Sequence, residues 1–210
     1  MNSYTFILAH GFGFDHSYWG NFINRLNGQK WMFFKDNLVL DPREKYIGLG
    51  HSLGFAKLSN STLNFDILVG LQCFCNFLGN GEKLRRLRKP HLDRMVSSVH
   101  DNPTAHLEQF YNSCGQGIIP KSKPDTDRLA MDLQMLYNSF LPRQLPTLII
   151  GGTKDEIVPK SLIEDNFRSH SQVTIKYLDL AGHTLGYDLA SEVIKTLIEF
   201  IRDHESPNRQ

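Results

Sequence analysis

Apolar and polar segments alternate along the chain in a way that predicts strands separated by helices. Short apolar runs rich in β-branched and aromatic residues, each ending at glycine or polar residues, are typical of buried strands; they cover residues 4–9, 31–34, 46–50, 66–74, 148–151 and 173–178. Apolar residues spaced three and four apart, typical of amphipathic helices, occupy 19–26 and 193–201. This alternation indicates an α/β domain with a mostly parallel central sheet flanked by helices.

The middle of the chain has a different pattern. Residues 76–142 carry charge and helical spacing, without a convincing strand. Two apolar helical faces stand out there, one made of Leu107, Phe110 and Tyr111 and the other of Leu129, Leu133, Leu136, Tyr137 and Phe140. We therefore expect a helical cap at 76–142, inserted into a core made of 1–75 and 143–204. A flexible tail is expected at 205–210.

Composition narrows the class of protein without indicating its chemistry. The chain has 210 residues, is 40% hydrophobic and has a formal net charge of +1, which favours one soluble domain and argues against a dedicated nucleic-acid binder. No apolar run is long enough to span a membrane, and the first residues lack a signal-peptide pattern. Three cysteines do not suggest a disulfide framework. We expect a cytoplasmic monomer without a metal or cofactor.

One pentapeptide carries the strongest chemical signal. Gly50-His51-Ser52-Leu53-Gly54 is a G-x-S-x-G sequence placed directly after a predicted strand and before a short helix. In a nucleophile elbow the serine occupies a sharp, strained turn that projects its oxygen from the strand end, and the flanking glycines allow the chain to fold that tightly. On its own the pattern also fits an ordinary glycine turn that contains a serine.

Three further segments follow other predicted strands in the order that a serine hydrolase needs. His10-Gly11-Phe12-Gly13 follows the first strand, Asp155 lies just past the strand at 148–151, and His183 lies past the strand at 173–178. The carboxyl ends of parallel strands meet at one edge of a sheet, where ligands bind in open α/β sheets. Ser, Asp, His is the chain order of the α/β-hydrolase triad. We therefore expect Ser52, Asp155 and His183 to meet.

The expected chemistry is acyl transfer to a serine. His183 would accept the Ser52 proton, Asp155 would hold the imidazole, and the backbone N–H groups of Phe12 and Leu53 would bind the oxyanion. Asp179 is a rival acid, disfavoured because it lies in the strand-to-loop step just before His183. The remaining histidines of these motifs, His10 and His51, are expected to shape the loops.

The motifs around these residues resemble those of a known family. The chain resembles the α/β-hydrolase superfamily and, within it, the carboxylesterases that cleave pimeloyl-acyl-carrier-protein methyl ester in biotin synthesis. The likeness lies in the segments 8–13, 49–54, 155–159 and 181–183, together with Trp19. The resemblance implies an acyl substrate, carried on acyl carrier protein. It also implies substrate contacts from Phe12, Leu53, Phe110, Tyr111 and Cys114.

The sequence departs from the pattern of that fold at two places. Only residues 35–45 separate the second and third predicted strands, and this segment is too polar and short to supply the helix that normally connects them. The prediction is a trimmed α/β-hydrolase fold whose crossover helix is shortened or lost. Phe55 stands where many relatives keep a small residue, which bears on packing behind the elbow.

A basic segment in the cap suggests a partner. Residues 83–94 carry six positive side chains against a single acid, Asp93. This pattern fits a solvated helix face or a docking patch for an acidic carrier protein, with Arg85, Arg86 and Arg88 as the candidate docking residues.

Several alternatives to an esterase share parts of this sequence pattern. A relaxed dinucleotide-binding pattern at 48–54 lacks the acidic residue that should end the following strand, because Asp66 begins that strand. Cys73, Cys75 and Cys114 do not have a zinc spacing. A general short-chain esterase, a thioesterase and a serine-triad lyase of quinone synthesis share the same triad. A receptor or scaffold on a hydrolase fold is the alternative that is not an enzyme.

Overall fold

A single parallel sheet organises the molecule. The computed structural model describes residues 4–115, 120 and 125–205. Its six strands are β1 (Tyr4–Ala9), β2 (Lys30–Phe33), β3 (Lys45–His51), β4 (Ile67–Leu71), β5 (Thr147–Gly152) and β6 (Val173–Leu178). They lie in the order β2-β1-β3-β4-β5-β6, and every neighbouring pair is parallel. The predicted mostly parallel sheet is therefore confirmed.

The central strands are mostly apolar because both faces of the sheet are covered. Every residue of β1, β4 and β5 is buried, as expected of a parallel sheet packed between helices. The edge strands β2 and β6 are only half buried. The register pairs Ala9 with Gly50 and His51 with Leu71, so the carboxyl ends of the central strands finish side by side.

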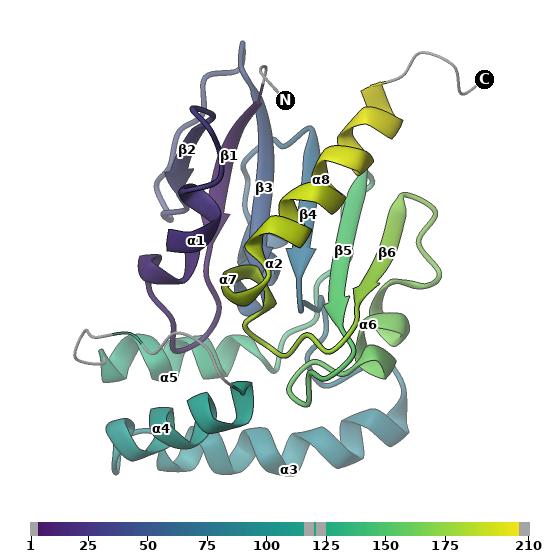
Figure 1. Cartoon of the computed structure of the whole chain (residues 1–210). Coiled ribbons are helices and arrows are strands. Elements are labelled where there is room, and N and C mark those ends of the chain that lie inside the picture. The colour runs from purple at the N-terminus through teal and green to yellow at the C-terminus, as the bar shows by residue number, and fades with distance from the viewer. Residues whose placement is uncertain (1–3, 116–119, 121–124, 206–210) are drawn as a thin grey trace.

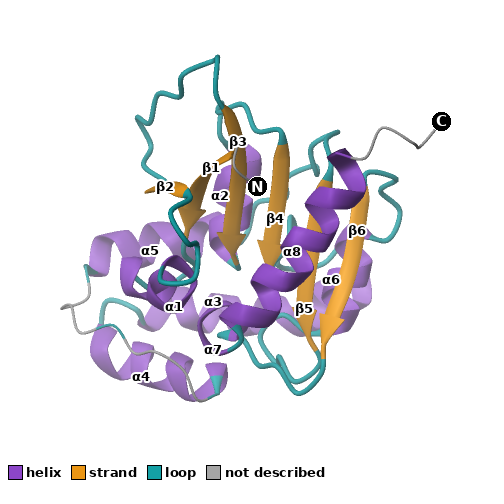
Figure 2. Cartoon of the chain, turned by 45° about the horizontal axis from the view of Figure 1, so that its top comes forward, coloured by secondary structure: helices purple, strands orange, loops and turns teal. Residues whose placement is uncertain are grey.

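Helices cover both faces of the sheet (Figures 1 and 2). One face carries a 3-10 turn, η1 (His16–Trp19), with α1 (Gly20–Ile23), α7 (Leu185–Asp188) and α8 (Ala190–Glu205), and the other carries α2 (Leu53–Asn60) and α6 (Lys160–Phe167). The closing helix predicted at 193–201 is α8. The helix predicted at 19–26 is shorter, because Asn24 ends it after one turn. Residues 206–210 of the expected tail lie outside the described residues.

Three helices lie beneath the carboxyl ends of the strands (Figure 1). They are α3 (Glu82–Ser98), α4 (Pro103–Cys114) and α5 (Thr126–Met135). The side chain of Asn102 caps α4 and that of Asp125 caps α5. An ion pair between Lys57 of α2 and Asp132 of α5, 2.5 Å long, joins these helices to the elbow helix. They occupy the stretch expected to be the cap, whose limits at 76 and 142 stay a prediction.

The connection between β2 and β3 contains no helix, as the sequence predicted. Residues 34–44 form turns and irregular chain. The Phe34 N–H donates to the Leu8 carbonyl, and the Asp41 N–H donates to the Tyr46 hydroxyl. Trp31 on β2 keeps 40% of its surface exposed.

In the part of the chain that the structure describes, no helix has the length and apolar character needed to cross a membrane.

Candidate active site

Ser52 occupies a strained turn between β3 and α2. Its backbone has φ 51° and ψ −122°, a left-handed conformation that non-glycine residues seldom adopt without a functional reason. A Cβ at Gly50 would lie 2.3 Å from the Phe55 backbone, and one at Gly54 would lie 2.2 Å from the Ala9 carbonyl oxygen. Glycine is therefore required on both sides of Ser52. This is the geometry of a nucleophile elbow.

Asp155 and His183 meet after β5 and β6. The His183 Nδ1 lies 2.7 Å from the Asp155 Oδ2, and both side chains are almost wholly buried. The second oxygen, Oδ1, accepts hydrogen bonds from the N–H groups of Ile157 at 2.7 Å and Val158 at 3.0 Å. Asp179 is exposed. The structure thus places Asp155, and not Asp179, against the histidine.

The position of the proton on His183 follows from its partners. A carboxylate only accepts hydrogen bonds, so Nδ1 carries the proton in the neutral ring. The Nε2 atom is buried and has no hydrogen-bond partner among the described residues. His51, directly before Ser52, contacts the His183 backbone, since its Nε2 lies 3.0 Å from that carbonyl oxygen. The structure thus joins Asp155 to His183 and places the loop of His183 beside the elbow, without a hydrogen bond between His183 and Ser52.

The two expected oxyanion donors belong to two segments next to Ser52. Leu53 is the first residue of α2, so its N–H has no acceptor within the helix. Phe12 lies in the turn after β1 that is closed by a hydrogen bond from the Phe14 N–H to the Gly11 carbonyl. A Cβ at Gly11 would lie 2.9 Å from the Ser52 Cβ, so this turn packs directly on the elbow. Both loops can contribute to one anion-binding site.

Aromatic side chains of the cap cover this site. The Phe110 ring of α4 lies 5.1 Å from the Phe12 ring and 6.2 Å from the His183 ring, measured between centroids. The Tyr111 hydroxyl donates to the Gly13 carbonyl, and burial raises its pKa to about 12. Cys114 is buried, with its carbonyl near Gly182. Of the expected acyl-pocket residues, Phe110 comes closest to the reacting groups, and Tyr111 fixes the turn after β1.

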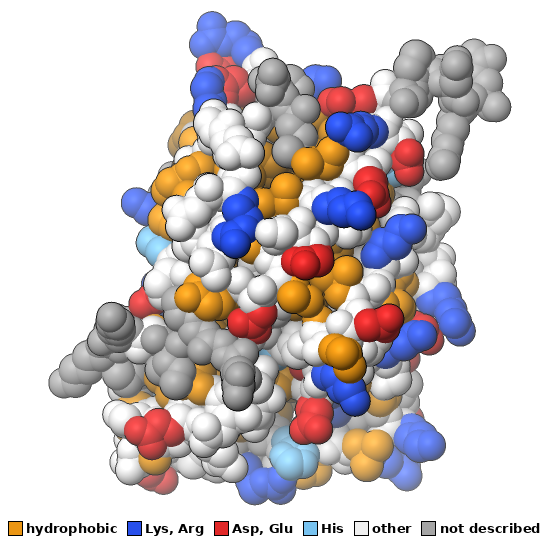
Figure 3. Space-filling view, in the orientation of Figure 1, with side chains coloured by type: hydrophobic (Ala, Val, Ile, Leu, Met, Phe, Trp, Pro, Cys, Tyr) orange, Lys and Arg blue, Asp and Glu red, His pale blue; other side chains and the backbone are white. Residues whose placement is uncertain are grey.

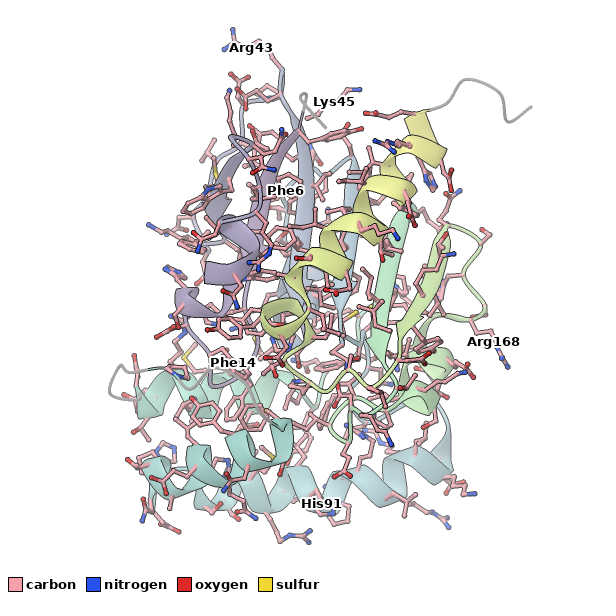
Figure 4. The ribbon with its side chains drawn as sticks, viewed as in Figure 1. Phe6, Phe14, Arg43, Lys45, His91 and Arg168 are labelled. Atoms are coloured by element: carbon pink, nitrogen blue, oxygen red, sulfur yellow. The ribbon has the colours of Figure 1, made fainter. Side chains whose placement is uncertain are left out.

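A cavity of about 440 Å³ is lined by that turn together with α4 and α5. His10, Gly13 and Phe14 form part of its wall, and Arg128 and Asp132 of α5 face them. Figure 4 shows Phe14 at the junction between the strand ends and the cap helices. Burial lowers the pKa of His10 to about 4, so this imidazole is neutral near pH 7. His10 is accordingly a neutral wall residue here, in keeping with the predicted supporting role.

Gln72 is a site residue that the sequence analysis missed. It follows β4 in a left-handed conformation with φ 46° and is fully buried. Its side chain donates to the Gly182 carbonyl at 2.7 Å and accepts from the Gly152 N–H at 2.8 Å. It thereby ties the loop of His183 to the end of the strand before Asp155. The signal was available, because Gln72 interrupts an otherwise apolar run.

The three arginines proposed for docking differ in their surroundings. Arg85 and Arg86 are exposed on α3, and Arg86 pairs with Glu82 at 2.5 Å. Arg88 is half-buried and donates to the backbone carbonyls of Phe77 at 2.6 Å and Ile157 at 2.9 Å. Burial lowers its pKa to about 10. The half-buried Arg88 therefore braces the loop that follows Asp155, and its guanidinium is already engaged, which leaves Arg85 and Arg86 as the exposed candidates.

The cysteines are buried thiols. Cys73, Cys75 and Cys114 are all free, and burial raises the pKa of Cys75 to about 12, which makes it a poor nucleophile. No cluster of His, Cys, Asp or Glu side chains suited to a metal ion occurs within residues 4–115, 120 and 125–205.

Comparison with known proteins identifies the fold. No protein-family model matches the sequence, and no curated protein matches it either. Among solved structures, an esterase from Exiguobacterium antarcticum aligns with TM-score 0.75 and 13% identity over 96% of this chain and 93% of its own. A bromoperoxidase from Bacillus anthracis aligns with TM-score 0.70 and 16% identity over 96% and 92%.

A third similar structure is MenH from S. aureus. It aligns with TM-score 0.63 and 14% identity over 98% of this chain and 96% of its own. These alignments span nearly the whole of each chain, so they include the sheet and the region of α3, α4 and α5. Because identities this low establish architecture and not activity, they support one conclusion: the chain has the α/β-hydrolase fold.

Proposed function

We propose that this protein is a serine esterase that cleaves a carboxylic ester through an acyl-enzyme. The observation that carries the proposal is the buried pair of His183 and Asp155, 2.7 Å apart, with the unpartnered Nε2 of His183 in the loop beside Ser52 on its strained turn. Asp155 holds the Nδ1 side of the ring, so Nε2 is the nitrogen left to act as a base. A bare Nε2 suits a group that must accept a proton during reaction.

The reaction follows from these positions. The Ser52 Oγ forms a bond to the acyl carbon while its proton passes to the His183 Nε2, and the carbonyl electron pair moves onto the oxygen. The N–H groups of Leu53 and Phe12 bind that oxyanion. Collapse breaks the bond to the leaving alcohol, which takes the proton from His183. A water molecule then repeats the two steps and releases the acid, while Asp155 stabilises the imidazolium.

Labelling of Ser52 tests the esterase directly. We expect a fluorophosphonate probe to modify the unaltered protein at Ser52, and p-nitrophenyl acetate to be hydrolysed with the same dependence on Ser52. The Ser52→Ala variant should lose both reactions, while Ser59→Ala, which alters a buried serine of α2, should keep them. Absence of an adduct, with Ser52→Ala indistinguishable from the unaltered protein, would favour the receptor or scaffold.

For the substrate we propose the methyl ester of pimeloyl-acyl carrier protein, acted on in the cytoplasm. The proposal rests on the motif resemblance and on the aromatic cover formed by Phe12 and Phe110 over the expected acyl site. Expression in a biotin auxotroph that lacks its methyl esterase should restore growth, and Ser52→Ala should not. Failure to rescue by a protein that cleaves nitrophenyl esters would leave a general esterase, a thioesterase or a serine-triad lyase of quinone synthesis.

For the carrier protein we propose docking on the exposed basic side of α3. Figure 3 shows basic side chains along the lower edge of the molecule, over α3, interspersed with acidic and apolar ones. A hollow at the start of α3 is lined by Glu82, Lys83, Arg86 and Leu87, and Leu87 is 63% exposed. An apolar side chain framed by cations suits an acidic protein surface.

Charge reversal separates docking from chemistry. Arg85→Glu with Arg86→Glu should slow hydrolysis of the carrier-bound ester and leave a small soluble ester unaffected, since both residues lie away from Ser52. The matched control is Arg43→Glu with Lys45→Glu, which makes the same change in net charge at the opposite end of the molecule (Figure 4). Equal slowing by both pairs, or loss of activity on both substrates, would contradict docking on α3.

A further inference from the structure

His51 is a buried titratable residue that the proposed reaction does not use. It is the last residue of β3, it directly precedes Ser52, and its side chain has no exposed surface. Its Nε2 lies 3.0 Å from the carbonyl oxygen of His183, across the sheet edge. The residue before the nucleophile thus contacts the backbone of the residue that carries the base.

The partners of His51 define its protonation. A carbonyl oxygen only accepts, so Nε2 must be the donor. The Nδ1 is buried against Gly11 and has no hydrogen-bond partner among the described residues. A proton there would leave a buried N–H unsatisfied, which is costly. Burial and the neighbouring His183 also hold the pKa of His51 well below its usual value. The ring is therefore neutral and donates through Nε2.

Tyr18 of η1 packs on the His51 ring and contacts the same turn as His51. Its ring stacks on the His51 ring, with centroids 4.2 Å apart and planes 14° from parallel. Its hydroxyl accepts a hydrogen bond from the Gly186 N–H at 3.2 Å. Phe14 packs edge-on against both rings, at 5.3 Å from Tyr18 and 5.4 Å from His51. The stacked pair consequently binds both ends of the turn that begins at His183.

We propose that His51 is a positioning residue for the catalytic base. Its Nε2–H holds the His183 carbonyl, and Tyr18, stacked on it, holds the Gly186 end of the same turn. Because His51 is covalently joined to Ser52, one peptide segment fixes both the nucleophile and the backbone of the base. The inference rests on the proposed esterase function, and it concerns the rate of the chemical step more than the affinity for the ester.

Two substitutions at His51 separate the hydrogen bond from the packing. His51→Phe keeps an aromatic ring to stack on Tyr18 and removes the donor. His51→Gln restores a donor, since its amide nitrogen is the same number of bonds from the Cα as Nε2 of histidine. We expect His51→Phe to lower kcat at least about tenfold with KM within about twofold, because small misplacements of a catalytic group cost rate. His51→Gln should recover most of that kcat.

Two further variants separate loss of positioning from loss of stability. Phe6→Leu removes buried aromatic volume higher in the sheet (Figure 4); it should lower Tm and leave kcat unchanged. Tyr18→Phe, which keeps the stack and removes the acceptor for Gly186, should lower kcat in the direction of His51→Phe. Nitrogen chemical shifts of His51 should report the Nε2–H tautomer.

The outcomes are distinct. Equal kcat for His51→Phe and His51→Gln, or a fall in kcat that only follows the loss of Tm as in Phe6→Leu, would overturn the inference and leave the esterase intact. If the unaltered protein neither reacted with a fluorophosphonate nor turned over an ester, the proposed function would fail first, and the positioning role with it.

Discussion

Replacing Asp155 by asparagine should invert the proton position on His183 with little change in shape. In the native protein the Asp155 Oδ1 accepts two backbone N–H bonds, from Ile157 and Val158, and Oδ2 accepts from the His183 Nδ1. The asparagine oxygen can keep the two backbone bonds only if its amide NH₂ faces His183. An NH₂ group donates, so the imidazole must leave Nδ1 bare and carry its proton on Nε2.

That change removes the group that accepts the Ser52 proton. We expect kcat of Asp155→Asn to fall about 10⁴-fold, equivalent to about 5 kcal/mol of transition-state stabilisation. The fold should persist, because the substitution is isosteric and both backbone bonds survive. The assay is hydrolysis of p-nitrophenyl acetate, together with Tm and the nitrogen chemical shifts of His183.

The matched control is Asp179→Asn, which removes an exposed carboxylate near the same loop and should leave kcat unchanged. A loss of less than about tenfold in Asp155→Asn, with the fold intact, would refute the assignment of His183 as the base oriented by Asp155. So would an unchanged His183 tautomer alongside a large loss of rate.

Three further predictions follow from other contacts. Asp132→Ala leaves the half-buried Lys57 ammonium unpaired and should cost about 3 kcal/mol of unfolding free energy in urea, whereas Lys57→Met with Asp132→Leu should change it by about 1 kcal/mol or less. Phe110→Ala opens the cover over His183 and should raise kcat/KM for longer acyl chains about tenfold relative to acetate; an unchanged chain-length profile of nitrophenyl esters would contradict this. The folded protein keeps His10 neutral down to its pKa of about 4, while the unfolded chain takes up that proton near pH 6.5. The free energy of unfolding should therefore fall by roughly 3 kcal/mol as the pH drops from about 6.5 to about 4, and His10→Gln should flatten the fall.

The strands and the reacting residues were predictable because their signals are local. Periodicity located all six strands, and β1 and β6 have the predicted bounds. The strand predicted at 66–74 ends at Leu71, since Gln72 turns into a left-handed conformation to bind two neighbouring loops. The polar Gln72 within an apolar run marks the position, but the turn itself is stabilised by partners 80 and 110 residues away along the chain, which no local pattern identifies.

The sequence did not predict the roles of two further side chains, one charged and one aromatic. Arg88 belongs to a run of basic residues that composition alone would place at the surface, yet its side chain is half-buried and donates to two backbone carbonyls. Tyr18 lies just before the helix predicted at 19–26, and no pattern in the sequence singles it out. Its stacking on His51 depends on how the turn after β1 packs against β3. Both roles arise from tertiary contacts, which spacing along the sequence does not encode.

The short connection at 34–44 has a consequence for how the molecule folds. With no helix between β2 and β3, three adjacent strands pair within residues 4–51. Pairing between segments close in sequence costs less loop-closure entropy and speeds folding. We therefore expect the β2-β1-β3 unit to form early and to present the strained serine turn as a template on which the later strands assemble. Early protection of the amides of β1 and β3 in pulsed hydrogen exchange is the corresponding signature.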